Sequence, residues 1–447
     1  MNEPLSVATS VLLAFALPYF VGYFIVGIAT IRSHAGSLGA QERVPLPLEG
    51  TTAAREVYYL VPALNEERVI GETVASLLRT TAGRVVVVDD GSSDQTAEVA
   101  RAAAEASGGG ARLLVVERRL PEARQGKGAA LNAAIGVVAA DARSRGLDPQ
   151  QVVVCVMDAD GRLSDGAVEH ALAAFDDPRV GAVQLIVRIR NREKWITRIQ
   201  DVEFWTISAT SQFARTHTGT VSLGGNGQFT RLAALESIEG SVWSDSLTED
   251  LDLGLRLYAQ GWRITTVPYG FVHQQGIEDY RTLLKQRTRW YQGHMSSARR
   301  IPELVRSPRL NEIALLESVS YLLVPWFVVL PWSILQQLVL VAAILQPEAW
   351  VLRDVGGSPL TVWGLWALWY VISFSPNLMI GVTYALRTRS VNLWQALLLG
   401  HVMIVYNYVG YLAAWCALFR MLRGKTGWSK TPRVAESAPA AAAGVRP

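Results

Sequence analysis

The sequence predicts an α/β domain that lies between membrane segments. Short Val-rich runs alternate with Ala-rich stretches from residue 57 to residue 187, and this alternation predicts a mainly parallel sheet flanked by helices. An uncharged apolar stretch precedes this region, and three longer ones follow it. Half of the 447 residues are hydrophobic, which is too many for a purely soluble chain.

The overall charge and the cysteines exclude two classes of protein. Forty-two basic and 39 acidic side chains give a formal net charge of +3, so there is no basic footprint for nucleic acid. Cys155 and Cys416 both lie in apolar runs, which favours reduced, buried thiols over a disulfide framework.

The first 32 residues predict a transmembrane helix, because residues 7–30 carry no charge and are long enough to span a bilayer. A cleaved signal peptide is the alternative, but Glu3 stands where a basic region would be expected. Arg32 and Arg43 follow, so the positive-inside rule places the next domain in the cytosol. Residues 33–54 have the composition of a linker.

The catalytic-domain prediction covers residues 55–275 and rests on five expected strands. They are residues 57–61, 85–89, 113–116, 152–157 and 180–187. Ligands of such sheets bind at the carboxyl ends of the strands, so residues just after these runs are the first candidates for a site.

The C-terminal part predicts a multi-pass protein of the cell membrane. An amphipathic region of residues 276–312 leads into residues 313–420, where residues 313–345, 360–386 and 391–419 are apolar. Basic residues follow the last segment, so one of the three must not cross; Pro325 and Pro331 predict a broken or interfacial helix for the first. Residues 421–447 end in an Ala/Pro tail that is predicted to be disordered.

Two strand ends offer carboxylates and amides at one crevice. Asp89 and Asp90 end the second expected strand, and Pro62, Asn65 and Glu66 follow the first. A carboxylate there can accept hydrogen bonds from a nucleoside. A turn followed by a helix cap is the alternative.

Asp158 and Asp160 follow the fourth expected strand as an Asp-x-Asp pair. Their hard oxygen ligands suit Mg²⁺ or Mn²⁺ bridging a sugar diphosphate, whereas Zn²⁺ would favour Cys and His. Lys127, between two glycines, could meet the same diphosphate. Solvated loops are the alternative for both.

Two helical motifs complete the series. Thr248 precedes Glu249 and Asp250, which suits either a helix N-cap or a general base at Asp250. The run from Gln286 to Trp290, in a helix expected over residues 280–297, could neutralise a diphosphate leaving group and stack on a sugar. A basic amphipathic helix on anionic lipid is the alternative.

This ordered series resembles the D, DxD, TED and Q(Q/R)xRW motifs of family 2 glycosyltransferases. The likeness covers roughly residues 55 to 300 and includes the membrane-integrated synthases of cellulose, chitin, hyaluronan and poly-N-acetylglucosamine. It implies a GT-A fold of Rossmann-like type, a UDP-sugar donor, a divalent ion and inversion at the anomeric carbon.

The resemblance also assigns roles. Asp250, with Glu249, would be catalytic. The donor would be bound by Pro62, Asn65, Glu66, Asp89, Asp90, Lys127, Asp158, Gln286, Arg287 and Arg289. Asp158 and Asp160 would hold the metal, with His273 as a further ligand, although a lone His is more often structural. The acceptor would be bound by Gly225, Asn226, Gly227, Gln228 and Trp290, and Trp428, Lys430, Thr431 and Arg433 resemble a gating element.

The expected function is therefore extension of a β-linked polysaccharide with a hexose or N-acetylhexosamine from a UDP-sugar, and its passage through the enzyme's own membrane helices. One alternative keeps the site but makes a single transfer to a lipid acceptor, as ceramide and diacylglycerol glucosyltransferases do. A second is a transporter with an attached nucleotide-binding sensor domain. The predicted partners are the donor, the polysaccharide or lipid acceptor and membrane lipid, without nucleic acid.

Overall fold

The computed structural model describes residues 21–22, 25–29, 32, 55–345, 359–388, 391–425 and 427. Most of the predicted N-terminal helix, the linker and the C-terminal tail lie outside the described residues. The predicted gating residues Trp428, Lys430, Thr431 and Arg433 lie outside them as well.

A seven-stranded mixed sheet forms the centre of the domain, in the order β3-β2-β1-β4-β8-β6-β9. Its strands are β1 (Glu56–Ala63), β2 (Arg84–Asp89), β3 (Leu113–Glu117), β4 (Val152–Val156), β6 (Val180–Gln184), β8 (Gln228–Arg231) and β9 (Arg263–Thr265). All neighbouring pairs are parallel except those of β8, which runs antiparallel to β4 and β6. The mainly parallel sheet is therefore confirmed, but β8 was not expected.

The prediction of a single strand over residues 180–187 is wrong, because this segment divides between two sheets. β6 ends at Gln184, and β7 (Ile186–Ile189) joins β10 (Phe271–Gln274) and β5 (Arg162–Leu163) in a three-stranded sheet. At the division, the Leu185 N–H donates to the Gly227 carbonyl at 3.0 Å. Both halves are buried and apolar, so hydrophobic periodicity gave no sign of the change.

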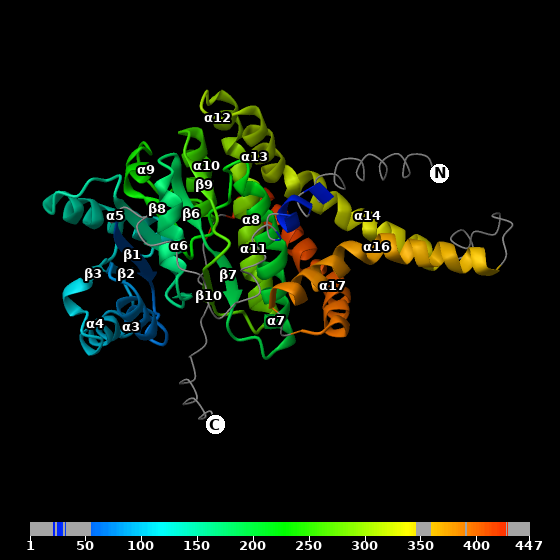
Figure 1. Ribbon diagram of the computed structural model, residues 1–447, viewed down its shortest axis with the longest axis horizontal. Helices are drawn as coiled ribbons and strands as arrows, with labels where there is room; N and C mark the ends of the chain where they lie inside the picture. The colour runs from blue at the N-terminus through cyan, green and yellow to red at the C-terminus, as the bar shows by residue number, and fades with distance from the viewer. Residues whose placement is uncertain are drawn as a thin grey trace, which may run out of the picture.

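Helices cover both faces of the large sheet, as the alternation of side chains along a strand requires. Tyr58 and Leu60 pack against the helices on one face of the sheet, and Tyr59 and Val61 pack against the helices on the other face. The first layer contains α5 (Lys127–Ser144), α9 (Leu232–Glu236) and α10 (Glu249–Ala259); the second contains α3 (Ile70–Thr80), α4 (Thr96–Ala106) and α6 (Ala167–Ala173) (Figure 1). Short 3₁₀ turns occupy Gly110–Arg112, Ala174–Asp176 and Ala298–Arg300.

A second helical group lies beside the small sheet. α7 (Trp195–Val202), the π-helical segment η3 (Glu203–Ser208) and α8 (Ala209–Thr216) form one continuous run. α11 spans Tyr280–Ser297, as the sequence predicted, and α12 (Ile301–Arg306) leads to α13 (Glu312–Val324).

The C-terminal helices are α13, the π-helical segment η5 (Pro325–Val329), α14 (Leu330–Leu345), α16 (Pro359–Thr388) and α17 (Leu393–Leu422). At Pro325, which cannot donate the helical hydrogen bond, the helix changes to the π-helical segment η5 but stays continuous, so the broken or interfacial helix stays a prediction. Among the described residues, Glu312–Leu335 and Leu393–Leu422 are long and apolar enough to cross a membrane. This is a matter of length and composition only, so the number of crossings stays a prediction.

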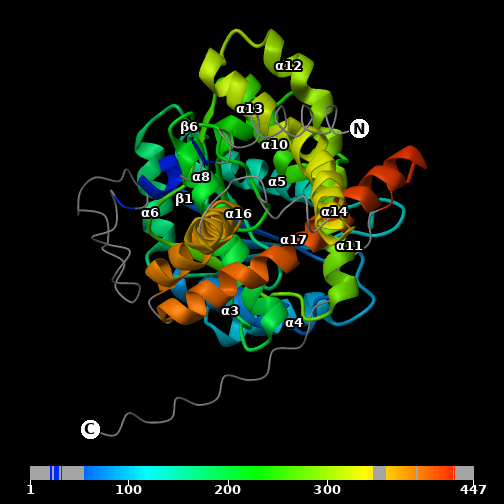
Figure 2. The same ribbon diagram turned by 90° about the vertical axis from the view of Figure 1, so that its right-hand side faces the viewer.

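α17 carries an exposed apolar stripe. Trp394, Leu398, Val405, Leu412 and Phe419 are spaced by four or seven residues and are all exposed, which places them on one side of the helix. The opposite side packs against α11 and α16, and α14 and α16 project from the same side of the domain (Figures 1 and 2). Such a surface suits lipid. Cys416 is exposed here, contrary to expectation, whereas Cys155 is buried; both are free thiols.

Candidate functional site

A cavity of about 570 Å³ lies where β1 and β4 end, between α10 and α11, and continues to α13 and η5. Eleven of the residues predicted from the sequence line it: Pro62, Glu66, Asp90, Lys127, Asp158, Glu249, Asp250, Gln286, Arg287, Arg289 and Trp290. The motifs, separated by more than two hundred residues of sequence, therefore meet in one place.

The two neighbouring aspartates at the end of β2 have different positions. Asp90 lines the cavity and is bound by the Arg118 guanidinium; burial raises the pKa of its carboxyl. Asp89 instead accepts a hydrogen bond from the Ser92 N–H at 2.9 Å and closes the following turn. Asn65 does not line the cavity either; its Oδ1 accepts from the Ser93 N–H at 2.8 Å. For Asp89 and Asn65, the geometry matches the turn alternative.

Lys127 connects three of the motifs. It is the first residue of α5, and its Nζ donates to Asp158 Oδ1 at 2.6 Å and to the Gly225 carbonyl at 2.9 Å. Burial alone would lower the pKa of Lys127, but the carboxylates of Asp158, Glu249 and Asp250 raise it above its ordinary value. The ammonium group therefore remains charged inside the cavity.

Glu249 and Asp250 begin α10 and line the cavity; Glu249 is buried, and Asp250 is half-buried. Burial raises the pKa of Glu249 to about 7, and the charge of Asp250 adds to this effect. Burial also raises the pKa of Asp250, while the charges of Lys127 and Arg289 oppose the rise. A carboxylate with a raised pKa is suited to accept a proton near neutral pH.

Thr248 occupies the N-cap position of α10, as predicted, but its hydroxyl makes no capping hydrogen bond. Its Oγ1 is buried against α11, where a Cβ added to Gly293 would lie 2.5 Å away. Any larger residue at Gly293 would push α11 off this segment, so the glycine allows the two helices to meet.

The second aspartate of the Asp-x-Asp pair is separated from the cavity. Asp160 is fully buried, and its Oδ2 accepts from the Gln275 N–H at 2.9 Å. His273 lies away from the cavity lining; burial lowers its pKa to about 4, and Arg188 and Arg190 reinforce the effect. No cluster of three or more His, Cys, Asp or Glu suitable for a metal occurs among the described residues. Asp158 is the member of the predicted metal set whose side chain faces the cavity.

The glycine loop before β8 has only its first residue, Gly224, in the cavity lining. Gly225 has a φ of 66°, and a Cβ there would lie 2.9 Å from Asp250 Oδ2. Asn226 is buried and accepts a hydrogen bond from the Asp158 N–H at 3.2 Å. Gly227 and Gln228 likewise lie outside the lining, and Gln228 is fully buried in β8. The loop thus contacts Asp158 and Lys127, and its role in acceptor binding stays a prediction.

The two arginines of the α11 motif have different surroundings. Arg287 is buried, pairs with Glu203 at 2.6 Å and lies 4.2 Å from the centre of the Trp290 ring. Arg289 makes no ion pair within the described part of the chain, and its charge lowers the pKa of Glu249 and Asp250. Arg287 therefore orders the wall, whereas Arg289 is placed to meet an anionic ligand.

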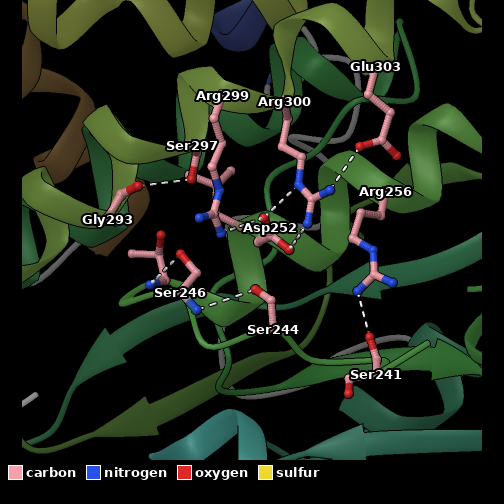
Figure 3. Close-up of polar contacts among 12 residues, drawn as sticks. Ser241, Ser244, Ser246, Asp252, Arg256, Gly293, Ser297, Arg299, Arg300 and Glu303 are labelled. Atoms are coloured by element: carbon pink, nitrogen blue, oxygen red, sulfur yellow. Dashed lines mark hydrogen bonds and ion pairs between the residues drawn. The ribbon is translucent and has the colours of Figure 1, made fainter. Parts of the chain in front are cut away.

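A bidentate ion pair fastens α10 to the 3₁₀ turn after α11. Arg300 Nε donates to Asp252 Oδ1 at 2.8 Å, and its Nη2 donates to Asp252 Oδ2 at 2.9 Å. Figure 3 shows the Arg300 side chain pointing down to Asp252, with Glu303 and Arg256 beside it. Asp252 lies one residue beyond Leu251 on α10, so this pair fixes the helix that carries Asp250.

Sequence reasoning missed the far end of the cavity and two glutamines. Gln184 Oε1 accepts from the Gly224 N–H at 2.8 Å, and Gln274 Oε1 accepts from Asn226 Nδ2 at 3.2 Å. The far end contains Phe204, Tyr291, His294, Tyr321, Val324, Pro325 and Val329. A polar residue inside an apolar strand was the available signal for the glutamines, but nothing in the sequence links Tyr321 or Val329 to a site.

Comparison with known proteins gives a family, two curated relatives and a solved structure. A family model described as "Glycosyltransferase like family 2" matches residues 54–293. A β-monoglucosyldiacylglycerol synthase of Trichormus variabilis is 34% identical over 181 residues, 40% of this chain and 36% of the relative. A poly-β-1,6-N-acetyl-D-glucosamine synthase of Staphylococcus aureus is 31% identical over 143 residues, 32% of this chain and 34% of the relative.

The match with these curated relatives thus spans about a third of their length. Among solved structures, a mannosyltransferase from Pyrobaculum calidifontis, in complex with GDP-Man and Mn²⁺, has a TM-score of 0.53 at 19% identity. The likeness covers 90% of this chain and 99% of that one, which shows a shared fold.

Proposed function

This chain belongs to the glycosyltransferase-like family 2 and has a GT-A-like α/β fold with a mixed sheet, and from this we propose that it transfers one hexose from a UDP-sugar to a hydroxyl of a membrane lipid. One observation carries the proposal: the cavity that contains Asp250 continues without interruption to Val324, Pro325 and Val329 of a candidate membrane helix. An apolar acceptor can enter there from the bilayer.

We assign the donor to the end of the cavity near the sheet. Asp90 is placed to accept hydrogen bonds from the nucleoside, with Pro62 and Glu66 beside it. Lys127 and Arg289 face the same cavity and supply positive charge for the diphosphate. Gln286 completes this wall.

Asp250 is the proposed general base. It accepts the proton of the acceptor hydroxyl as that oxygen forms a bond to the anomeric carbon. The bond from the anomeric carbon to the diphosphate oxygen breaks at the same time, and UDP leaves with the electron pair. Attack from the side opposite the leaving group inverts the anomeric carbon. Glu249, with a pKa raised to about 7, adds a second carboxyl whose proton is available near neutral pH.

The residues present fit Mg²⁺ or Mn²⁺ through Asp158, because Mg²⁺ commonly takes only one or two protein carboxylates together with substrate phosphates. When bound, such an ion would neutralise charge on the diphosphate. The Pyrobaculum mannosyltransferase was solved with Mn²⁺, but the assignment here depends on the Asp158 side chain in this cavity. Asp160 and His273 stay predictions of the sequence.

Extension of a polysaccharide is the second candidate. Phe204, Trp290, Tyr291 and Tyr321 line the cavity, and aromatic faces suit sugar rings. The predicted gating residues that favoured this function lie outside the described residues. The Staphylococcus relative, named as a poly-β-1,6-N-acetyl-D-glucosamine synthase, supports it, whereas the Trichormus relative supports the lipid acceptor.

The experiment that separates the two candidates is product analysis. Purified protein in vesicles that contain diacylglycerol would be given UDP-glucose or UDP-N-acetylglucosamine, and the products would be resolved by mass. A lipid carrying one sugar supports the proposal. A ladder of sugar lengths would instead support the polysaccharide candidate.

A further inference from the structure

A second cavity of about 210 Å³ adjoins the first, between η3, α8 and α13. Five of its lining residues also line the main cavity: Glu203, Ser208, Gln212, Ser222 and Tyr321. Ile207, Ser211 and Arg215 line the second cavity alone. We call this space the side pocket. It branches from the main cavity on the side of the candidate membrane helix α13.

The side pocket offers hydroxyl groups and a carboxylate oxygen to a ligand. Within the described part of the chain, the hydroxyls of Ser208 and Ser211 make no hydrogen bond. Glu203 uses its Oε2 for Arg287 and for the Tyr406 hydroxyl, at 2.6 and 2.8 Å, and its Oε1 makes no contact of this kind with the described residues. Serine hydroxyls can donate and accept, and a carboxylate accepts, so together they match neutral hydroxyl and ester groups.

The walls of the side pocket are held rigidly. The Gln212 side chain donates to the Ser222 carbonyl at 2.8 Å and accepts from the Ser222 N–H at 2.9 Å. Arg215 is buried; its Nε lies 2.9 Å from Glu317 Oε1, and its guanidinium lies 3.9 Å from the centre of the Tyr321 ring. These contacts join α8 to α13, so the pocket exists before any ligand arrives.

The charges around the side pocket disfavour an anionic ligand. Among its described lining residues the one cation, Arg215, is paired with Glu317, and the carboxylate of Glu203 is paired with Arg287. A phosphate placed there would therefore find no unpaired cation among the described lining residues to compensate its charge. A neutral polyol meets no such penalty.

The adjoining π-helical segments support a role in ligand binding. Glu203 and Ser208 are the two ends of η3, and Pro325 and Val329 are the two ends of η5; all four line the main cavity. π-helical turns are rare and occur often at functional sites. Two π-helical segments that line the same cavity therefore support a ligand-binding role for that cavity.

We propose that the side pocket binds the neutral, oxygen-rich head group of the acceptor, either the glycerol of a lipid or the terminal sugar of a glycan, next to the hydroxyl that reacts at Asp250. The apolar remainder of a lipid acceptor then lies along Val324, Pro325 and Val329. This inference rests on the proposed function and specifies which acceptors that site accepts.

Ser211 provides the most selective test, because it lines the side pocket and not the main cavity. Ser211→Leu would fill the pocket, and Ser211→Ala would remove only the hydroxyl. Ser76→Leu, on α3 away from both cavities, is the matched control for a Ser-to-Leu change on a helix. Melting temperatures would show that each variant folds.

Three quantities would be measured for each protein: KM for the acceptor, KM for the UDP-sugar, and release of UDP without acceptor. Ser211→Leu should raise the acceptor KM about tenfold or more, the loss expected for one or two hydrogen bonds. The donor KM and the acceptor-independent release should stay at the wild-type level. Ser211→Ala should show a smaller rise in the same direction, which keeps the test valid if the larger variant unfolds.

Vesicles with diacylglycerol, a soluble oligosaccharide and vesicles with phosphatidic acid would distinguish the ligands. A rise in KM for diacylglycerol or for the oligosaccharide identifies the source of the head group. Strong inhibition by phosphatidic acid that Ser211→Leu relieves would overturn the neutral-head inference. An acceptor KM unchanged in both Ser211 variants would also overturn it, while leaving the proposed function intact. If the wild type transfers sugar to no acceptor, both this inference and the proposed function are wrong.

Discussion

Lys127 Nζ lies 2.6 Å from Asp158 Oδ1, and this contact holds together motifs that the sequence presents as separate and individually weak. The same ammonium donates to the Gly225 carbonyl and raises the acidity of Glu249 and Asp250. One half-buried cation thus connects the proposed donor end, the glycine loop and the proposed base.

The first prediction concerns pH. Lys127 lowers the pKa of both Glu249 and Asp250, so Lys127→Met should raise both. The base would then stay protonated up to a higher pH, and the acid limb of kcat/KM should move upward. The measurement is the pH profile of kcat/KM at saturating divalent ion. Arg124→Met, at an exposed arginine outside the cavity lining, is the control. An acid limb that does not move would show that neither carboxyl titrates in catalysis.

The second prediction concerns the divalent ion. Activity should disappear with excess EDTA and return with Mg²⁺ or Mn²⁺. Asp158→Asn should raise the ion concentration needed for half-maximal activity, because that carboxylate faces the cavity. His273→Gln should not, because His273 lies away from it. If Asp160→Asn raises the ion concentration needed and Asp158→Asn does not, Asp160 is the metal ligand, as the sequence predicted. Full activity in EDTA would end the metal assignment.

The third prediction concerns the Asp252–Arg300 pair. Arg300→Met leaves the buried Asp252 carboxylate with the Ser244 side chain and the more distant Arg299, at 3.8 Å. Because Arg300 is partly exposed, we expect a loss at the lower end of the range for a broken buried pair, about 3 kcal/mol of unfolding free energy. We also expect a lower kcat with an unchanged donor KM, since α10 carries Asp250.

Arg299→Met is the matched control, because this neighbouring side chain is more than half exposed and its pair is worth less than about 1 kcal/mol. Arg300→Lys should restore part of the stability and part of kcat. The measurements are chemical denaturation and steady-state kinetics on Arg300→Met, Arg299→Met and Arg300→Lys. Equal losses from both methionine variants would contradict the assignment of Arg300.

The fold was largely predictable because its signals are local. α11 was expected over the residues that form it, and the ends of β2 and β4 were expected to carry Asp90 and Asp158. Strand periodicity and strand ends are properties of a few adjacent residues. The division between β6 and β7 was not predictable, because Leu185 and Ile186 are both buried and apolar in different clusters.

The motifs predicted the site residues whose side chains face the cavity. They did not show which neighbouring side chains point away from it. Asp89 and Asp90 are adjacent, but their side chains differ in direction, and sequence could not choose between them. Tyr321 and Pro325 enter the site through packing of α13 beside α11, and such a tertiary contact has no signature in a single sequence.

The fourth prediction concerns Trp428, which the sequence places in a gating element. A segment that closes over bound donor excludes water, so its loss should lower turnover and leave stability intact. Trp428→Ala should therefore reduce turnover at an unchanged melting temperature. The comparison is with a double variant, Lys430→Ala and Arg433→Ala, in the same membrane. If only the double variant is impaired, the segment binds anionic lipid through charge instead.

The most direct test of the whole account is UDP release by the wild type and by Asp250→Asn in the same diacylglycerol vesicles, with UDP binding measured on both proteins. The account predicts release that depends on the lipid in the wild type, and a fall of at least ~10² in Asp250→Asn, the lower range for loss of a general base. UDP affinity should be the same in both. Near-normal release by Asp250→Asn would contradict the account, because the cavity would then lack the base on which the proposed transfer depends.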